Sequence, residues 1–84
     1  DLGVTMALVS SFLDKPISNK MAFLGEVGLG GEVRTVNKID HRLSEINKLG
    51  FKKAVIPKSN TLDQNTDLKS LGVSNISAAI KKAL

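Results

Sequence analysis

The side chains that could do chemistry in this sequence are mainly basic, and they gather in its second half. Residues 1–33 carry two lysines against four carboxylates, whereas residues 34–84 carry ten lysines and arginines against four carboxylates, an excess of six positive charges. A basic surface can bind phosphate groups or an acidic protein, or it can be a solvated lysine face without a ligand. The candidate residues are Arg34, Lys38, Arg42, Lys48, Lys52 and Lys53.

Other catalytic or metal sites have little support in the residue types. The absence of cysteine excludes disulfides, cysteine zinc fingers, iron–sulfur clusters and thiol catalysis. Since the 84 residues also contain no ATPase or zinc motif, no cofactor is expected in them. The single histidine, His41, is expected on the surface. Serines and lysines are plentiful, but no pair has a spacing that specifies Ser–Lys hydrolysis. Glu26 and Glu32 could approach each other across a hairpin, although exposure to solvent is the simpler expectation.

The glycine-rich segment 25–31 invites comparison with a phosphate-binding loop. No Gly-Lys-Ser/Thr follows it, and the G-x-G-x-x-G pattern needs a glycine where the sequence has Val33. The segment also connects two expected strands, so no helix N-terminus follows to receive a phosphate. We therefore expect a turn or a bulge here.

Hydrophobic periodicity predicts the elements that carry these residues. A first helix begins at the N-terminus and ends at Asp14, two residues before Pro16. Its inward stripe is Leu2, Met6, Val9 and Leu13, and Val4, Leu8 and Phe12 widen the apolar surface enough for packing on both sides.

A hairpin and a second helix are expected next. The hairpin joins strands at 21–27 and 32–36. Asn37 is the expected N-cap of the helix, and Gly50 is its expected left-handed stop. The inward residues of this helix are Ile39, Leu43, Ile46 and Leu49.

The last third of the sequence predicts a strand at 51–57, a polar loop at 58–66, a short strand at 68–73 and a final helix capped by Ser74. The inward residues of that helix are Ile76, Ala79, Ile80 and Ala83. The expected order is helix, hairpin, helix, strand, strand, helix, which is a mixed α/β (α+β) fold. A chain of 84 residues holds a single small domain at most.

The second helix and its flanks carry the candidate cations. Lys38, Arg42 and Glu45 fall on its outer stripe and Lys48 in its last turn, while Arg34 precedes the helix. Such an arrangement could follow a phosphate backbone. The three phenylalanines, Phe12, Phe23 and Phe51, are expected in the core, so base stacking on an aromatic platform is not supported.

Four blocks of the sequence carry a recognisable pattern: Asp1–Val4, Phe23–Arg34, Arg42–Glu45 and Lys48–Lys58. Two of them contain the motifs Gly-Glu-Val-Gly-Leu and Lys-Leu-Gly-Phe-Lys, and the spacing of these motifs makes the pattern specific. In these blocks the sequence resembles the C-terminal Lon-protease-like domain of the RadA/Sms DNA-repair proteins, and the resemblance covers most of residues 1–58.

The resemblance implies a fold and a role. The fold is Lon peptidase-like, with the architecture of the second domain of ribosomal protein S five, and residues 1–84 are the C-terminal part of such a domain. The role is a non-proteolytic scaffold in a DNA repair and recombination ATPase, supporting binding of single-stranded or branched DNA and assembly of a homo-oligomer, a hexamer in the parent. ATP, Mg and Zn are implied for the parent only, because no ATPase or zinc motif is present. The implied location is the cytoplasm, at the bacterial nucleoid, or an organelle matrix or stroma.

Two alternatives stay open beside this interpretation. The first is a fragment of an ATP-dependent Lon-type Ser-Lys peptidase. By resemblance, the Lon serine would fall just before Asp1 and the Lon lysine at Asp40, and a carboxylate cannot replace the amine as general base. The second is a purely structural assembly domain.

Two features of the chain bear on membrane insertion and on whether it is part of a longer protein. The longest apolar runs have four residues, so no membrane span is expected. The chain begins with Asp1 and no leader, and we expect it to be part of a longer protein.

Overall fold

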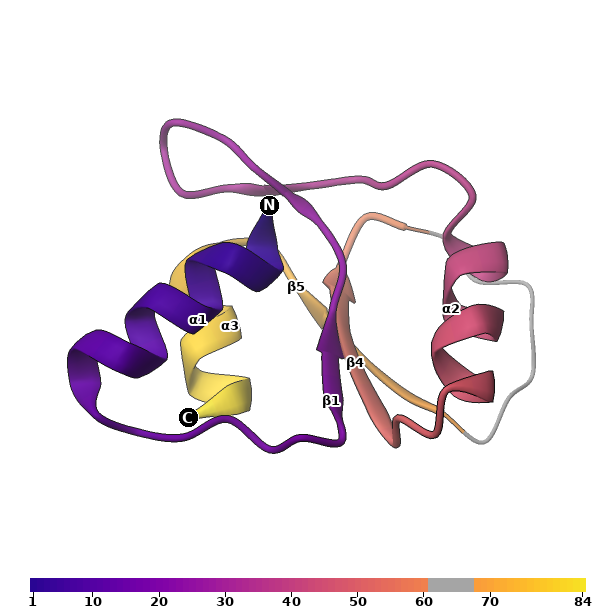
Figure 1. The fold of residues 1–84 in the computed structure, drawn as a ribbon. Coiled ribbons are helices and arrows are strands. Elements are labelled where there is room, and N and C mark those ends of the chain that lie inside the picture. The colour runs from indigo at the N-terminus through magenta and orange to yellow at the C-terminus, as the bar shows by residue number, and fades with distance from the viewer. Residues whose placement is uncertain (61–67) are drawn as a thin grey trace.

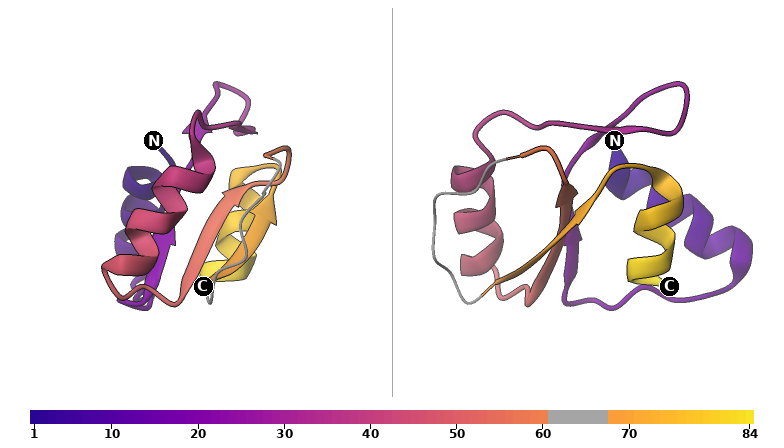
Figure 2. Two further views of the ribbon diagram at one scale, coloured as in Figure 1. Left: turned by 90° about the vertical axis from the view of Figure 1, so that its right-hand side faces the viewer. Right: turned by 180° about the vertical axis from the view of Figure 1, so that it is seen from behind.

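A parallel sheet with helices on both faces organises the chain. The computed structural model describes residues 1–60 and 68–84. Helices α1 and α3 cover one face of the sheet, and α2 covers the other (Figures 1 and 2). The elements are α1 (Leu2–Leu13), β1 (Met21–Phe23), β2 (Glu26–Val27), β3 (Val33–Arg34), α2 (Ile39–Lys48), β4 (Lys53–Pro57), β5 (Lys69–Val73) and α3 (Ile76–Ala83).

The main sheet has the strand order β1-β4-β5, with both pairs parallel. Ala54 of β4 lies opposite Ala22 of β1 and Ser70 of β5. As the middle strand, β4 is covered on both faces, and its residues 54–57 are all buried. A continuous apolar run is typical of a parallel strand in this position.

Two hydrophobic cores lie on opposite faces of the sheet, and β4 contributes to both. Because side chains alternate along a strand, Val55 joins the core under α1 and α3, while Ala54 and Ile56 join the core under α2. The first core holds Leu2, Met6, Val33, Val55, Val73 and Ala79, and the second holds Ile39, Leu43, Ala54, Ile56 and Leu68.

The prediction of a mixed α/β fold is confirmed, but the predicted element order is not. The expected strand at 21–27 is two strands in different sheets: β1 pairs with β4, and β2 pairs with β3 in an antiparallel hairpin. Gly25 separates them with a φ of 153°, a conformation that favours glycine. The observed order is therefore helix, strand, hairpin, helix, strand, strand, helix.

The predicted helix caps need two corrections. Lys38, and not Asn37, is the N-cap of α2, with a left-handed φ of 57° and no side-chain capping bond. Asn75, and not Ser74, caps α3, because its side chain accepts a hydrogen bond from the Ala78 N–H at 2.8 Å. The stop at Gly50 is confirmed by its φ of 94°. The end of α1 before Pro16 is also confirmed.

Several predicted inward residues lie at the surface instead. Leu2 and Met6 of α1 are buried as expected, but Leu13 is exposed, as are Val4 and Leu8. Leu49 is 76% exposed because α2 ends at Lys48 and the chain leaves the core there.

The expected polar loop at 58–66 begins with a turn at Lys58, and residues 61–66 lie outside the described residues. The predicted strand at 68–73 is confirmed as β5, and the strand at 51–57 begins two residues late, as β4. In the described residues, no helix has the length and apolar character needed to span a membrane.

Candidate functional site

Helix α2 presents the middle of the basic stretch to solvent. Ile39 and Leu43 are buried against the sheet, so the residues on the opposite side of the helix point outward. Lys38 and Arg42 are four residues apart and both are exposed. At that spacing side chains lie above one another on the same side of a helix.

The chain segment that leads into α2 is fixed by the side chain of Asn60, which follows the end of β4. The Asn60 amide accepts a hydrogen bond from the Val36 N–H and donates one to the Val36 carbonyl, each at 3.1 Å. Lys38 follows two residues later in a left-handed conformation. The position of Lys38 at the start of α2 therefore depends on contacts made by residues distant in sequence.

All six candidate cations are exposed, but the structure divides them between the two ends of α2. Arg34 and Lys38 lie near its start, whereas Lys48 is its last residue and the Lys52–Lys53 pair follows its end. Arg42 lies between these groups. Since a ten-residue helix is about 15 Å long, the cations at the start of α2 and those at its end are separated by a distance of that order.

Two further lysines, Lys20 and Lys69, lie beside the Lys52–Lys53 pair, and the sequence analysis did not select them. The Lys20 carbonyl accepts hydrogen bonds from the N–H groups of Lys52 and Lys53, at 2.8 and 3.2 Å, and the Lys69 N–H donates to the Lys52 carbonyl at 3.0 Å. Lys53 and Lys69 are also register partners on β4 and β5. We call Lys20, Lys52, Lys53 and Lys69 the strand-start lysines.

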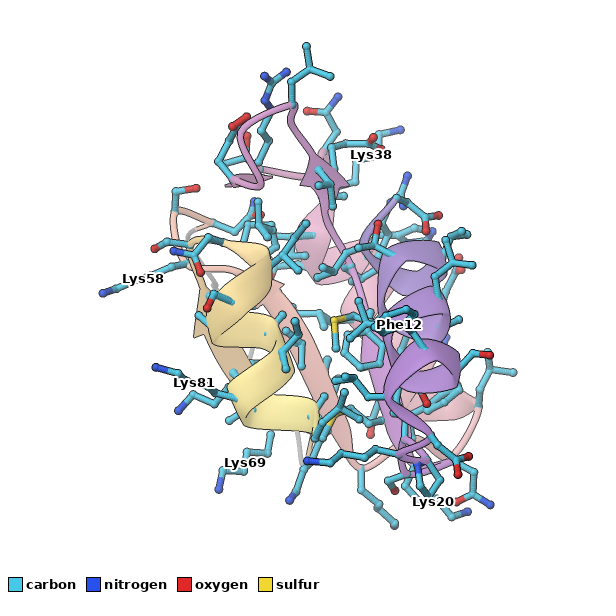
Figure 3. The ribbon with its side chains drawn as sticks, turned by 90° about the vertical axis from the view of Figure 1, so that its left-hand side faces the viewer. Phe12, Lys20, Lys38, Lys58, Lys69 and Lys81 are labelled. Atoms are coloured by element: carbon cyan, nitrogen blue, oxygen red, sulfur yellow. The ribbon has the colours of Figure 1, made fainter. Side chains whose placement is uncertain are left out.

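Parallel strands begin at the same edge of a sheet, and this geometry brings the strand-start lysines together. Figure 3 shows Lys20 and Lys69 at the end of the molecule opposite Lys38. Recognising that the strands at 21, 53 and 69 pair in parallel would have identified Lys20 and Lys69 from the sequence.

Two ion pairs modify the charge near α2. The Arg34 guanidinium lies 3.5 Å from the Glu32 carboxylate, and His41 Nε2 lies 2.8 Å from Glu45 Oε1. All four side chains are substantially exposed, and exposed pairs of this kind contribute about 0–1 kcal/mol. Among the described residues, the other candidate cations have no ion pair, so their charge is available to a ligand.

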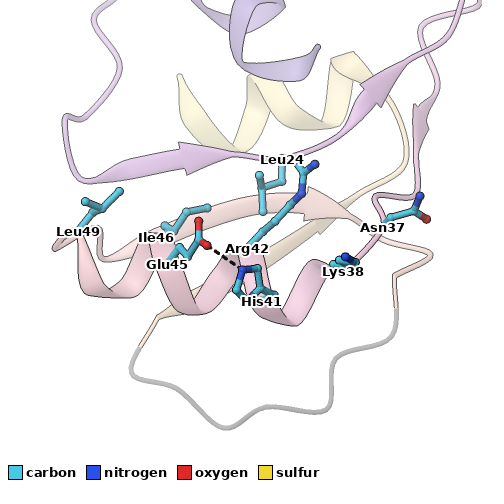
Figure 4. Close-up of a pocket in the computed structure, with 8 residues that line it drawn as sticks. All are labelled: Leu24, Asn37, Lys38, His41, Arg42, Glu45, Ile46 and Leu49. Atoms are coloured by element: carbon cyan, nitrogen blue, oxygen red, sulfur yellow. Dashed lines mark ion pairs between the residues drawn. The ribbon is translucent and has the colours of Figure 1, made fainter.

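A hollow of about 480 Å³ runs beside α2 (Figure 4). Leu24, which follows β1, lines it together with Ile46 and Leu49 of the last turn of α2 and its cap. Its full lining is Leu24, Asn37, Lys38, His41, Arg42, Glu45, Ile46 and Leu49. The hollow thus combines apolar side chains with two of the candidate cations.

The glycine-rich segment is a turn between strands, as predicted. The Gly28 N–H donates to the Glu32 carbonyl at 2.9 Å, and the Gly31 N–H donates to the Gly28 carbonyl at 3.0 Å. The Glu32 side chain lies over Gly28, where an added Cβ would come within 1.7 Å of Glu32 Oε1. A carboxylate in this position is unsuited to a phosphate-binding loop.

The groups considered for hydrolysis do not form a Ser–Lys pair. The Ser10 hydroxyl donates to the Lys15 carbonyl, and Ser18 Oγ accepts a hydrogen bond from the Lys20 N–H at 3.2 Å. In residues 1–60 and 68–84, no hydrogen bond joins a serine hydroxyl to a lysine ammonium. Asp40 lies in the first turn of α2.

One aromatic residue is more exposed than predicted. Phe12 is 89% exposed, whereas Phe23 and Phe51 are partly buried against the two cores. Phe12 lies on α1, on the opposite face of the sheet from α2 (Figures 1 and 3). It therefore does not interleave with the cations of α2.

Comparison with known proteins gives two kinds of match. The model of the family described as subunit ChlI of Mg-chelatase matches residues 1–60. The chain is 45% identical over its whole length to the DNA repair protein RadA of Synechocystis, and 44% identical over its whole length to the RadA proteins of Listeria monocytogenes and Bacillus subtilis. The chain covers only 17–19% of the length of these relatives. The resemblance to RadA that the residues indicated is confirmed.

Proposed function

The chain belongs to the family described as subunit ChlI of Mg-chelatase and matches the DNA repair protein RadA along its whole length, and from this premise we propose that it is a DNA-binding scaffold domain of a DNA repair ATPase. The domain holds DNA through phosphate contacts and takes part in assembling a homo-oligomer. ATP hydrolysis with its Mg, and zinc binding, belong to parts of the longer protein beyond these residues. The longer protein acts at the bacterial nucleoid or in an organelle matrix or stroma.

The observation that carries the DNA-binding role is the set of exposed cations at both ends of α2, most of which have no ion pair within residues 1–60 and 68–84. Lys38 and Arg42 lie on the side of α2 that borders the hollow, and the strand-start lysines lie at the edge of the sheet where β1, β4 and β5 begin. A lysine or arginine that neutralises a phosphate releases condensed counterions, and this release drives sequence-independent binding. Nothing in this arrangement requires a base-specific contact.

The oligomerisation role is supported by the apolar surface of α1. Val4, Leu8 and Phe12 recur at intervals of four residues and are 60%, 67% and 89% exposed. Three large apolar side chains in one line on a helix are typical of a surface that is covered in an assembly. We assign this surface to a second copy of the chain.

Two other roles have weaker support. A carboxylate stands at Asp40, where the resemblance to Lon peptidases places the catalytic lysine, so a peptidase role is not proposed. A metal-handling role, which the family's description names, would need ligating side chains. Within the described residues, no group of three or more His, Cys, Asp or Glu side chains could hold a metal ion.

A titration of fluorescent DNA across a salt series tests the DNA-binding role. The double variant R34E/K38E should bind more weakly than the wild type, and the slope of log K against log[salt] should become shallower by about 1.4–1.8, because two phosphate contacts are lost. The matched control is K81E/K82E, which reverses two charges in the last turn of α3, on the other face of the sheet. An equal loss in both double variants would indicate an effect of net charge alone.

A further inference from the structure

The hollow beside α2 is divided into an apolar half and a basic half. Leu49 and Ile46 lie toward the end of the helix, and Lys38 lies at its start (Figure 4). Arg42 extends from the middle of α2 toward Leu24. A ligand that fills the hollow must therefore present an apolar body at one side and negative charge at the other.

We propose that this hollow receives one unpaired base of single-stranded DNA, with the adjoining phosphates on Arg42 and Lys38; this role rests on the proposed DNA-binding function. A nucleotide joins an apolar, planar base to an anionic phosphate, which is the combination that the two halves accept. The volume of about 480 Å³ lies in the range of about 300–1,000 Å³ found for small-molecule sites.

The apolar half selects against duplex DNA. In a duplex both faces of a base are covered by its neighbours, so a paired base has no free face to lay on Leu24, Ile46 or Leu49. An unstacked base has such a face, and the planar Arg42 guanidinium offers a second surface on which bases commonly stack. The hollow thus adds affinity for single strands without an aromatic platform.

The charges around the hollow fit a phosphate. Glu45 is the one carboxylate in the lining, and its Oε1 lies 2.8 Å from His41 Nε2, so the lining sets two cations, Lys38 and Arg42, against one carboxylate. Arg42 and Lys38 have no ion pair among the described residues. A phosphate that arrives between them is met by two cations.

Anisotropy titrations with a labelled oligothymidine and with a duplex of the same length test this role in the 84-residue chain. The variant L49S should weaken binding of the single strand about fivefold and leave duplex binding and both salt slopes unchanged, because it removes apolar contact and no charge. Leu49 is 76% exposed and α2 ends before it, so the variant should fold, as circular dichroism will verify. The matched control is L29S, which removes an exposed leucine from the glycine-rich turn, outside both the hollow and the apolar surface of α1.

A second variant separates the base from the phosphate. R42K keeps the charge but loses the planar guanidinium, so it should weaken single-strand binding and preserve the salt slope. If the wild type binds DNA while L49S and R42K leave the ratio of single-strand to duplex affinity unchanged, the base-binding role is wrong and the phosphate contacts stand. If the wild type binds neither DNA, the proposed function itself fails. Competition by polyglutamate as effective as that by oligothymidine would assign the hollow to acidic protein instead.

Discussion

At the scale of single residues, Gly25 allows several elements to pack closely at the point where they meet. It is buried where the start of α1, the strand β3 and the end of β4 meet, and its carbonyl accepts a hydrogen bond from the Leu2 N–H at 2.9 Å. A Cβ added to Gly25 would lie 2.8 Å from Val33 Cγ1 and 3.6 Å from Pro57 Cγ. Both its backbone conformation and its surroundings therefore require glycine.

The variant G25A should lower the free energy of unfolding by about 1–3 kcal/mol. The backbone strain at this φ and the steric clash of the added Cβ with Val33 both contribute to the loss. Urea denaturation followed by circular dichroism measures the loss. G3A is the matched control. Gly3 lies within α1 with no atom closer than 3.5 Å to an added Cβ, so alanine there should stabilise by about 0.5–1 kcal/mol. Equal stability of G25A and the wild type would contradict this account of the junction.

Among the elements, α2 carries the proposed DNA contacts of Lys38 and Arg42, and the chain at its start is fixed by a residue distant in sequence. The Asn60 side chain makes both hydrogen bonds to Val36, and these fix the chain just before Lys38. Since Asn60 follows β4, the orientation of the basic helix is tied to the middle strand of the sheet.

The variant N60A should destabilise the fold by about 1–2 kcal/mol through loss of the two hydrogen bonds. Amide hydrogen exchange should show reduced protection at Val36 and Arg42, whose N–H groups donate to Asn60 Oδ1 and to the Lys38 carbonyl, and unchanged protection in the middle of β4. S59A, which alters the exposed neighbouring residue, is the control. Uniform loss of protection across the chain would contradict a local role for Asn60.

The elements also show how far the sequence can predict this fold. Local patterns identified three helices, the hairpin turn and the strands β4 and β5, because periodicity, Pro16 and Gly50 act within a few residues. The separation of β1 from β2 depends on which partner each strand meets, and no local pattern records that choice. The same reason explains why Lys20 and Lys69 were missed beside Lys52 and Lys53.

Across the whole molecule, the two faces of the sheet differ in chemical character. The α2 face and the sheet edge beside it carry cations, which the proposed function assigns to DNA, while the α1 surface of Val4, Leu8 and Phe12 is apolar. The broad apolar pattern in α1 predicted packing on both sides, and the structure shows that one side is uncovered in the isolated chain. A second copy supplies the missing contact in the proposed assembly.

The double variant L8S/F12S should remain monomeric at concentrations where the wild type associates, because the apolar area that drives association is removed. Sedimentation velocity across a concentration series measures this, with L29S as the control for loss of an exposed leucine outside α1. A wild type that stays monomeric throughout, or a double variant that associates equally, would contradict the assignment of this surface.

The central claim is that the chain binds DNA through exposed cations, and the salt dependence of binding by the wild type tests it most directly. Titrations of oligothymidine at increasing salt should give binding that weakens steadily, with a slope of log K against log[salt] of magnitude up to about 4, since as many as six cations can neutralise phosphates. Absence of binding at the lowest salt concentration, or binding that does not change with salt, would contradict the claim.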